Sequence, residues 1–314
     1  MQAYRAPALL FSSHIETIYP ALLRTVDGII YQRERISTPD NDFLDLDWLN
    51  NHSQKLVILS HGLEGNSHRA YMKGMARLFF KHSFDVLAWN YRGCSGEMNR
   101  QLRFYHSGAT DDLNTVIQHA ISKGYTEINL VGFSLGGNLA LKYLGEQGDN
   151  LPAPVKRAVV FSVPLHLHSS SEKIASSAFG IYARRFLKTL KQKVALKATL
   201  MPGIDTQSLH RIHNLLDFDD AYTARLHGFE GAIDYYERCS SLYFLDKIKR
   251  PALLVNAAND PFLSSGCYPQ NFAQHRYLKA EYPVRGGHVG FAQFNKNRVY
   301  WSELRALQFI QTGT

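Results

Sequence analysis

Short apolar runs recur along the chain, and segments with a helical pattern separate them. Helical patterns cover 70–82, 110–123 and 135–145. Because strands that alternate with helices form right-handed βαβ units, the order predicts an α/β protein with a doubly wound, mostly parallel sheet. Nearly continuous apolar runs are typical of parallel strands covered on both faces. These runs are 56–60, 85–90, 127–133, 157–163 and 252–258.

Two strands are expected before these runs and one after them. Residues 29–37 read as the first strand and 277–284 as the last. In 43–49 polar and apolar residues alternate, which predicts a half-buried antiparallel strand. Its apolar face would carry Leu44, Leu46 and Trp48, and its polar face Asp45 and Asp47. The sequence therefore predicts about eight strands, the first two antiparallel.

One long region interrupts this rhythm. Residues 164–245 contain several helical patterns and no convincing strand. An insertion of that size between two strands of a sheet is typical of a functional lid. We therefore expect a core made of 1–163 and 246–314, and a helical cap made of 164–245.

The motif Gly132-Phe133-Ser134-Leu135-Gly136 joins an apolar run to a helical pattern. A strand, a tight turn and a helix are what a nucleophilic serine needs, because the turn projects the hydroxyl beside a helix N-terminus. Glycines let neighbouring backbone pass close to the turn. The alternative is a glycine-rich turn with a bystander serine. We expect Ser134 to be a nucleophile and Phe133 to contact the substrate.

A serine hydroxyl needs a histidine base, which a carboxylate orients. In this architecture the chain order is serine, acid, histidine. His288 lies in a glycine-rich loop after the last expected strand, and Asp260 follows the strand 252–258. Their alternatives are a surface histidine and a turn aspartate. The rival acids lie in or beside the insertion and are Asp217, Asp219, Asp220 and Asp246.

Acyl transfer also requires two N–H groups that hold the developing oxyanion. One should belong to Leu135, directly after the serine, and the other to the loop after the strand 56–60. In that loop, the His61-Gly62 turn is open enough to direct the N–H of Leu63 toward the oxyanion. We interpret His61 as a packing or hydrogen-bonding residue, and Glu64 as a substrate contact.

With these motifs, the chain resembles the α/β-hydrolases, and more narrowly the YheT-type esterases, also described as embryogenesis-associated hydrolases. The resemblance covers nearly the whole chain. It implies a Ser134–Asp260–His288 triad and hydrolysis of carboxylic esters with short to medium acyl chains. The matching segments are HIETIYP at 14–20, DFLDLDW at 42–48, HGLEG at 61–65, YRGCSGE at 91–97 and YHSGATDD at 105–112.

The resemblance also sets limits on what can be expected. Eukaryotic relatives are described as medium-chain ester synthases/hydrolases or as acting on phospholipids. Glu16 stands where glutamine is expected, and Asn66 where serine is expected. Neither position belongs to the triad. Cap lobes differ most among members, so the resemblance leaves the substrate open.

Charge is concentrated in one part of the chain. The 314 residues include 35 Lys and Arg against 27 Asp and Glu, a net charge of +8. Seven basic residues and no acid lie in 173–197, which leaves 28 against 27 elsewhere. No nucleic-acid partner is expected, because no recognised binding motif accompanies the charge.

The segment 173–197 also carries an apolar helical face. In one interpretation it is a lid helix whose apolar side covers the pocket, so Phe179 and Tyr182 are candidate substrate contacts. In the other, it makes peripheral contact with an anionic membrane or lipid substrate. The apolar positions are Phe179, Tyr182, Phe186, Leu190 and Val194.

The remaining composition excludes several classes of protein. Three widely spaced cysteines form neither a disulfide framework nor a zinc site. No signal peptide or membrane span is read, so we expect a cytoplasmic protein. We expect no metal and no organic cofactor, and the sequence does not indicate an oligomeric state.

The sequence therefore predicts a serine esterase and leaves three other functions open. An acyl-enzyme captured by an alcohol would make the protein an acyltransferase. A lipid ester substrate would make it a lipase or phospholipase. A protein that kept only the fold would bind a lipid or a protein without catalysis.

Overall fold

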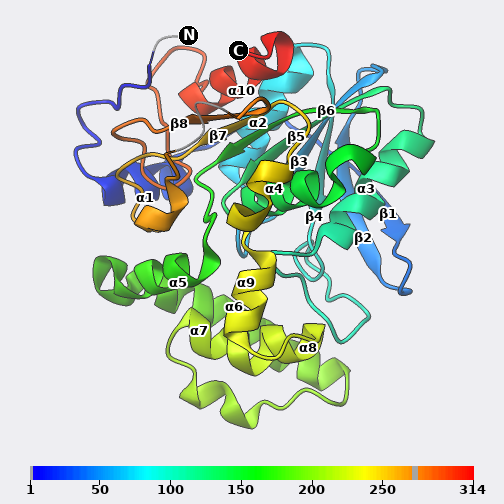
Figure 1. Ribbon diagram of the computed structural model, residues 1–314, viewed down its shortest axis with the longest axis vertical. Coiled ribbons are helices and arrows are strands. Elements are labelled where there is room, and N and C mark those ends of the chain that lie inside the picture. The colour runs from blue at the N-terminus through cyan, green and yellow to red at the C-terminus, as the bar shows by residue number, and fades with distance from the viewer. Residues whose placement is uncertain (1–2, 271–274) are drawn as a thin grey trace.

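A mostly parallel sheet forms the centre of the computed structural model, which describes residues 3–270 and 275–314 (Figure 1). Among these residues the sheet has eight strands in the order β1-β2-β4-β3-β5-β6-β7-β8. β1 pairs antiparallel with β2, β2 pairs antiparallel with β4, and the other pairs are parallel. This confirms the predicted fold class. The strands are β1 Gln32–Ser37, β2 Phe43–Leu49, β3 Lys55–Ser60, β4 Asp85–Asn90, β5 Glu127–Phe133, β6 Val155–Phe161, β7 Ala252–Val255 and β8 Leu278–Glu281.

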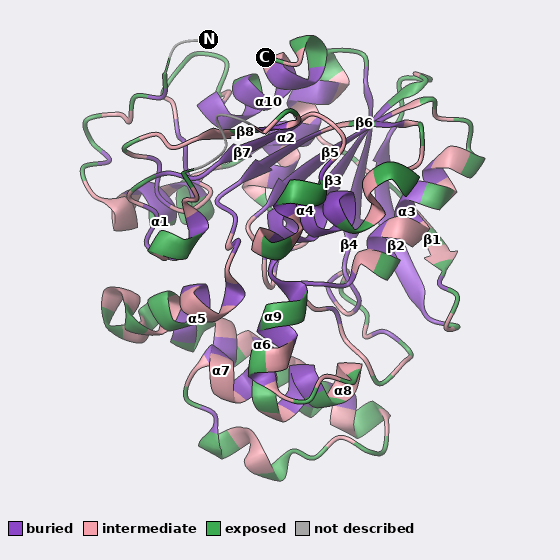
Figure 2. Ribbon diagram, viewed as in Figure 1, coloured by how far each residue is buried: buried purple, intermediate pink, exposed green. Residues whose placement is uncertain are grey.

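Helices cover both faces of the sheet because side chains alternate along each buried strand. In β3, Leu56 and Ile58 pack in one core cluster with α3 Thr110–Ser122 and α4 Leu135–Gln147. Val57 and Leu59 pack in a second cluster on the other face. That cluster includes residues of α2 Ala70–Lys81 and α10 Trp301–Thr312. Figure 2 shows the strands as the most continuously buried part of the molecule. α1 Ser13–Leu23 lies outside these layers (Figure 1).

The chain between β6 and β7 is helical and contains no strand. In Figure 1 it lies below the ends of the parallel strands. It has an apolar cluster of its own, which α6 builds with α7 and the turns beside it. Its α-helices are α5 Leu167–Ser176, α6 Ile181–Leu200, α7 Leu215–Phe218, α8 Arg225–His227 and α9 Ala232–Cys239. The π-helix η4 is Asp219–Ala224. Within the described residues, the 3-10 turns are η1 Gly148–Asn150, η2 Ser177–Gly180, η3 Gln207–Arg211, η5 Ser241–Lys247 and η6 Ser265–Cys267.

The prediction of a half-buried β2 was wrong, because its polar face is buried as well. Asp45 and Asp47 are buried under arginines of β1, the antiparallel partner strand. Arg33 donates to Asp47 through two nitrogens at 2.8 Å each, and Arg35 donates to Asp45 at 2.7 and 2.9 Å. A buried carboxylate is tolerated where such charge-assisted bonds satisfy it.

Candidate active site

The turn between β5 and α4 holds Ser134 in a strained backbone conformation. Its φ is 53° and its ψ is −119°, values that residues with a Cβ rarely adopt. Its N–H donates to the carbonyl of Phe161 at 2.9 Å. A Cβ on Gly136 would lie 2.3 Å from the Ser60 carbonyl oxygen, and one on Gly132 would lie 2.4 Å from that of Gly136. The turn therefore requires the glycines of the motif.

Ser134, His288 and Asp260 form one continuous chain of hydrogen bonds. His288 Nε2 lies 3.0 Å from Ser134 Oγ, and His288 Nδ1 lies 2.9 Å from Asp260 Oδ2. The Asp260 side chain is fully buried and that of His288 is 10% exposed. These partners favour the tautomer with its proton on Nδ1, which leaves Nε2 free to accept the serine proton. The structure thus brings together the three residues that the sequence analysis selected.

The loops that carry the acid and the histidine rest on α1. The buried carboxylate of Glu16 accepts from Asn259 Nδ2 at 2.6 Å and from the Gly286 N–H at 3.1 Å. Thr17 Oγ1 accepts from the His288 N–H at 2.9 Å. This role of α1 was not predicted from the sequence. The signal was the segment 14–20, which the resemblance included but to which we assigned no contact.

The two expected oxyanion donors lie beside Ser134. Leu63 and Leu135 line the same cavity as Ser134. Among the described residues, neither backbone N–H has a hydrogen-bond acceptor. The turn that carries Leu63 is fixed by a bond from the Gly62 N–H to the Tyr71 hydroxyl at 3.0 Å. Both N–H groups are therefore available to a ligand.

His61 lies next to this turn but is no second base. It is buried, and burial lowers its pKa to about 3. Its Nδ1 lies 2.8 Å from the Gly62 carbonyl oxygen, and its Nε2 accepts from the Tyr91 N–H at 3.3 Å. These contacts match the packing and hydrogen-bonding interpretation.

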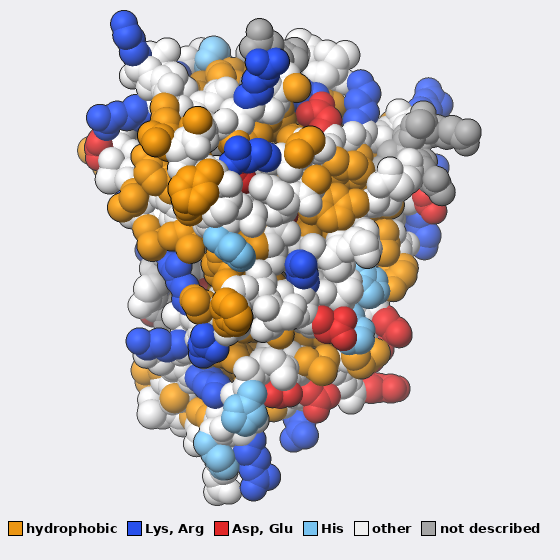
Figure 3. Space-filling view, turned by 90° about the vertical axis from the view of Figure 1, so that its left-hand side faces the viewer, with side chains coloured by type: hydrophobic (Ala, Val, Ile, Leu, Met, Phe, Trp, Pro, Cys, Tyr) orange, Lys and Arg blue, Asp and Glu red, His pale blue; other side chains and the backbone are white. Residues whose placement is uncertain are grey.

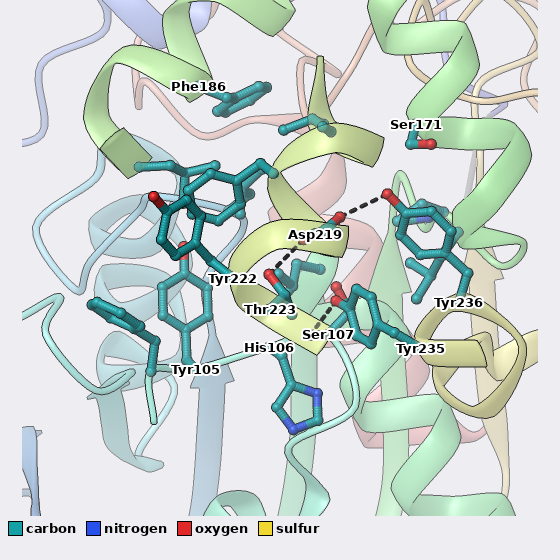
Figure 4. A pocket seen from close by; sticks show the side chains of 18 of the residues that line it. Tyr105, His106, Ser107, Ser171, Phe186, Asp219, Tyr222, Thr223, Tyr235 and Tyr236 are labelled. Atoms are coloured by element: carbon teal, nitrogen blue, oxygen red, sulfur yellow. Dashed lines mark hydrogen bonds between the residues drawn. The ribbon is translucent and has the colours of Figure 1, made fainter. Parts of the chain in front are cut away.

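Two cavities of about 110 and 240 Å³ meet at Ser134. The first extends under the helical segment between β6 and β7 and is lined mainly by apolar residues. Figure 4 shows part of this lining at close range. The second opens between α1, the 62–71 loop and α6, and His288 lines it. Phe186 of α6 and Phe262 border both cavities.

The predicted substrate contacts do not all reach the site. Tyr182 lines the second cavity, and its hydroxyl lies 3.0 Å from His14 Nδ1. Glu64 also lines the second cavity, but its carboxylate already binds Lys193. Phe133 is 1% exposed in the core and lines neither cavity. Phe179 is 94% exposed and lines neither cavity.

The position of Phe179 has a local cause. Ala178, Phe179 and Gly180 all have positive φ values, so the chain turns before α6 begins at Ile181. Phe179 is therefore not on the apolar face of α6, which starts at Tyr182. That face lines the two cavities through Tyr182, Phe186, Leu190 and Val194.

Asp219, one of the rival acids, lies in the first cavity wall. It opens η4 and accepts from Thr223 Oγ1 at 2.6 Å and from the Tyr236 hydroxyl at 2.7 Å (Figure 4). Burial raises the pKa of Asp219 to about 6. Asp217 instead caps α7, where it forms a capping box with Asn214. Of the acidic side chains in the described part of the chain, only that of Asp260 hydrogen-bonds to His288.

The basic segment 173–197 is not uniformly directed to solvent. Lys173, Arg184, Arg185 and Lys188 are exposed. Lys197 is buried, donates to Asn99 Oδ1 at 2.8 Å, and has its pKa lowered to about 7 by burial. The seven charges of this segment therefore do not all face water.

Other features considered from the sequence are cysteines, metal ligands and membrane-spanning helices. Cys94, Cys239 and Cys267 are free thiols and are buried. In the described part of the chain, no group of three or more His, Cys, Asp or Glu side chains could hold a metal ion. No helix within 3–270 and 275–314 is long and apolar enough to cross a membrane.

Comparisons with known proteins agree with this geometry. A family model described as "alpha/beta hydrolase fold" matches residues 55–291. The chain is 35% identical over 287 residues to "Putative esterase YheT" of Escherichia coli (strain K12), covering 88% of this chain and 84% of that protein. It is 28% identical over 305 residues to "Phospholipase ABHD3" of Bos taurus, covering 93% and 74%.

A solved structure shows the same fold. The Pyrococcus furiosus esterase Pf2001 aligns with a TM-score of 0.58 and 18% sequence identity, over 92% of this chain and 98% of that chain. Identity at that level supports the fold alone. From the family match and the similarity to YheT, the chain belongs to the α/β-hydrolase fold family, within the YheT-type group.

Proposed function

We propose that the protein is a serine hydrolase of carboxylic esters. The observation that carries this proposal is the unbroken hydrogen-bond chain from Ser134 Oγ through His288 to Asp260, with bonds of 3.0 and 2.9 Å. It ends on a serine held at φ 53°. The names of the relatives, an esterase and a phospholipase, support the same class of reaction.

The proposed reaction begins when Ser134 Oγ attacks the ester carbonyl carbon and His288 Nε2 takes its proton. Asp260 keeps the proton of His288 on Nδ1 and stabilises the imidazolium. The N–H groups of Leu63 and Leu135 hold the oxyanion of the tetrahedral intermediate. His288 then protonates the departing alcohol, and a water that it activates releases the acid from the acyl-enzyme.

The two cavities suggest where each half of the ester binds. The alcohol oxygen must be within reach of His288 to receive its proton. His288 lines the second cavity and not the first. The alcohol part therefore belongs in the second cavity, and the acyl part in the first cavity, whose lining is mainly apolar.

In this proposal residues 164–245 act as a cap over a core of 1–163 and 246–314. The apolar side of α6 borders both cavities, so a displacement of α6 would open the site. Enclosure of this kind keeps bulk water away from the charges that develop during reaction.

Replacement of Ser134 by Ala tests the proposal. We expect Ser134→Ala to abolish hydrolysis of p-nitrophenyl butyrate and octanoate, and to abolish labelling by a fluorophosphonate probe. Ser122→Ala, on the exposed side of α3, is the matched control and should keep full activity. Full activity of Ser134→Ala would exclude this nucleophile. Absence of labelling in the wild type would favour the non-catalytic binder.

Lipid esters and acyl transfer are the finer alternatives. The phospholipase relative and the apolar first cavity favour a lipid ester as substrate. A chain-length series of p-nitrophenyl esters, run beside a lysophospholipid and a triglyceride, measures that preference. Addition of ethanol, followed by mass spectrometry for ethyl esters, separates acyl transfer from hydrolysis.

A further inference from the structure

Glu64 fixes the turn that carries Leu63 through its N–H, its carbonyl oxygen and one carboxylate oxygen. Its N–H donates to the Tyr105 hydroxyl at 2.9 Å, and its carbonyl oxygen accepts from Arg69 Nη2 at 2.9 Å. Its carboxylate Oε1 accepts from the Tyr105 hydroxyl and from Lys193 Nζ, both at 2.7 Å. The φ of Glu64 is 54°, a conformation that costs a residue with a Cβ about 1–2 kcal/mol. Without these contacts the turn would relax.

Leu63 is thereby held from both sides. Before it, the Gly62 N–H donates to the Tyr71 hydroxyl at 3.0 Å. After it, Glu64 is bound to Tyr105 and Lys193. The direction of the Leu63 N–H is therefore set by two anchors, one on each neighbouring residue.

One of the residues that anchor Glu64 comes from outside the sheet and its flanking helices. Lys193 belongs to α6, in the segment between β6 and β7, whereas Tyr105 and Arg69 belong to the surroundings of the sheet. The side chains of Lys193 and Glu64 are 20% and 7% exposed, so the pair is largely shielded from water. Lys193 Nζ also lies 3.1 Å from Cys94 Sγ. Among the described residues, Lys193 makes the only hydrogen bond or ion pair between α6 and the 62–65 turn.

We infer that Lys193 is a positioning residue that couples closure of α6 to completion of the oxyanion hole. The inference rests on the proposed function, since it assigns the Leu63 N–H to the oxyanion. With α6 in place, the ammonium balances the Glu64 carboxylate and the turn keeps its strained form. With α6 displaced, a poorly compensated charge remains beside a strained backbone, and the Leu63 N–H loses its fixed direction.

The charge state of the pair supports this coupling. Burial opposes the charge on Lys193, but the neighbouring Cys94 and Glu64 raise its pKa above the usual lysine value overall. Lys193 therefore stays protonated at neutral pH and keeps its bond to Glu64. Chemistry would then be fastest when the cavities are covered, as is typical of enzymes whose lids complete the site.

A second role for Lys193 has to be separated from this one. Lys193 also lines the first cavity, so it could contact the acyl group directly. A contact made equally in ground state and transition state changes KM, whereas an oxyanion donor acts in the transition state and changes kcat. Removal of one oxyanion donor costs about 100- to 1,000-fold in kcat. A mispositioned donor should cost less.

The test is the steady-state kinetics of Lys193→Met on p-nitrophenyl butyrate. We expect kcat to fall about 10- to 100-fold and KM to change by less than about threefold. Gln192→Met is the matched control, because Gln192 lies beside Lys193 on the same helix and is exposed; it should stay within about twofold of wild type. Lys193→Arg, which keeps the charge, should recover most of the lost kcat.

A double-mutant cycle with Glu64→Gln completes the test. If the two residues act as one unit, the double variant is no slower than the slower single variant. The inference would be overturned if the losses of kcat in the two single variants multiplied in the double variant. It would also be overturned if Lys193→Met left kcat unchanged or changed KM alone. Circular dichroism identifies a variant that fails to fold, in which case Lys193→Arg and Lys193→Gln carry the comparison. If the wild type itself neither hydrolyses esters nor reacts with the fluorophosphonate, the proposed function fails instead.

Discussion

Asp219 is an acid whose surroundings oppose its charge. It lines the first cavity, and its hydrogen bonds come from two neutral hydroxyls, those of Thr223 and Tyr236. Burial raises its pKa to about 6, above the ordinary value of about 3.9. A carboxyl with a raised pKa destabilises the fold once it ionises, so its contribution worsens as the pH rises from about 4 to about 6.

We therefore expect Asp219→Asn to gain thermal stability relative to wild type as the pH increases. The difference in melting temperature should be larger at pH 8 than at pH 4, corresponding to at most about 3 kcal/mol. Asp220→Asn is the control, because Asp220 is the exposed neighbour. Thermal unfolding followed by circular dichroism measures both. A difference that does not change with pH would contradict the assignment of the raised pKa to Asp219.

At the residue scale, sequence reasoning succeeded where position along the strands decided the outcome. Ser134, Asp260 and His288 follow the strands β5, β7 and β8, whose ends lie at the same edge of the parallel part of the sheet, so their convergence could be predicted. Glu16 lies on a helix near the start of the chain, and its contact with Gly286 spans 270 residues. No local pattern announces such a contact, because only tertiary packing brings the two segments together.

At the scale of elements, the β1–β2 pair shows a buried polar face held by an edge strand. Asp47 accepts from Arg33, Ser67 and Asn90. Burial raises the pKa of Asp47, but these bonds outweigh that effect and lower it below its usual range. A lowered pKa means that the ionised form stabilises the fold above about pH 4, and that this stability is lost as the pH falls through the lowered value.

Arg33→Met should therefore destabilise the protein at pH 7 by about 1–3 kcal/mol, since it leaves a buried carboxylate with fewer partners. The loss should begin to shrink below about pH 4, as the pH approaches the lowered pKa at which Asp47 takes up a proton in the folded protein. Lys55→Met is the control, because its pair with Glu127 is 3.9 Å long and the lysine is 59% exposed. Urea unfolding at pH 7 and pH 3.5 measures both variants. Equal losses for the two variants would contradict the role of the buried pair.

The existence of elements was predictable from periodicity, while their ends depended on contacts between them. The run 252–258 reads as one strand, but β7 ends at Val255. The Asn256 side chain then bonds to the backbone N–H and carbonyl oxygen of Val163, at 2.7 and 3.1 Å, so side-chain bonds replace backbone pairing on the side that faces the end of β6. The half-buried prediction for β2 failed for a similar reason, since alternation does not reveal that a partner strand supplies arginines.

At the scale of the whole molecule, exposed apolar and basic side chains share one face. Figure 3 shows orange apolar patches with Lys and Arg among them, on the side where α1 and α5 lie in Figure 1. Leu22 and Leu23 of α1 are 60% and 67% exposed, and Phe179 is 94% exposed. Arg184, Arg185 and Lys188 of α6 are exposed as well. Apolar groups flanked by basic ones suit the surface of an anionic membrane.

We expect the protein to co-sediment with vesicles that contain anionic lipid, and less so as salt increases. The triple change Arg184→Glu, Arg185→Glu and Lys188→Glu should weaken binding more than tenfold, because each basic residue contributes about 1 kcal/mol. An equal charge change elsewhere on the surface, at Lys81, Lys156 and Lys247, is the control. Equal effects of the two triple variants, or no binding by the wild type, would mean that Arg184, Arg185 and Lys188 face water without contacting a membrane.

The junction of two cavities at Ser134 also has a consequence for covalent inhibition. On the proposed mechanism, a carbamate that acylates Ser134 would leave its carbamoyl group in the first cavity and expel its alcohol through the second. Residues that line only the first cavity, such as Asp219 and Tyr236, would then govern how long the inhibited enzyme lasts. Residues near α1 would govern how fast the inhibitor reacts. The rate at which an inhibitor reacts and the duration of the inhibition could thus be changed separately, the rate through its alcohol part in the second cavity and the duration through its carbamoyl part in the first.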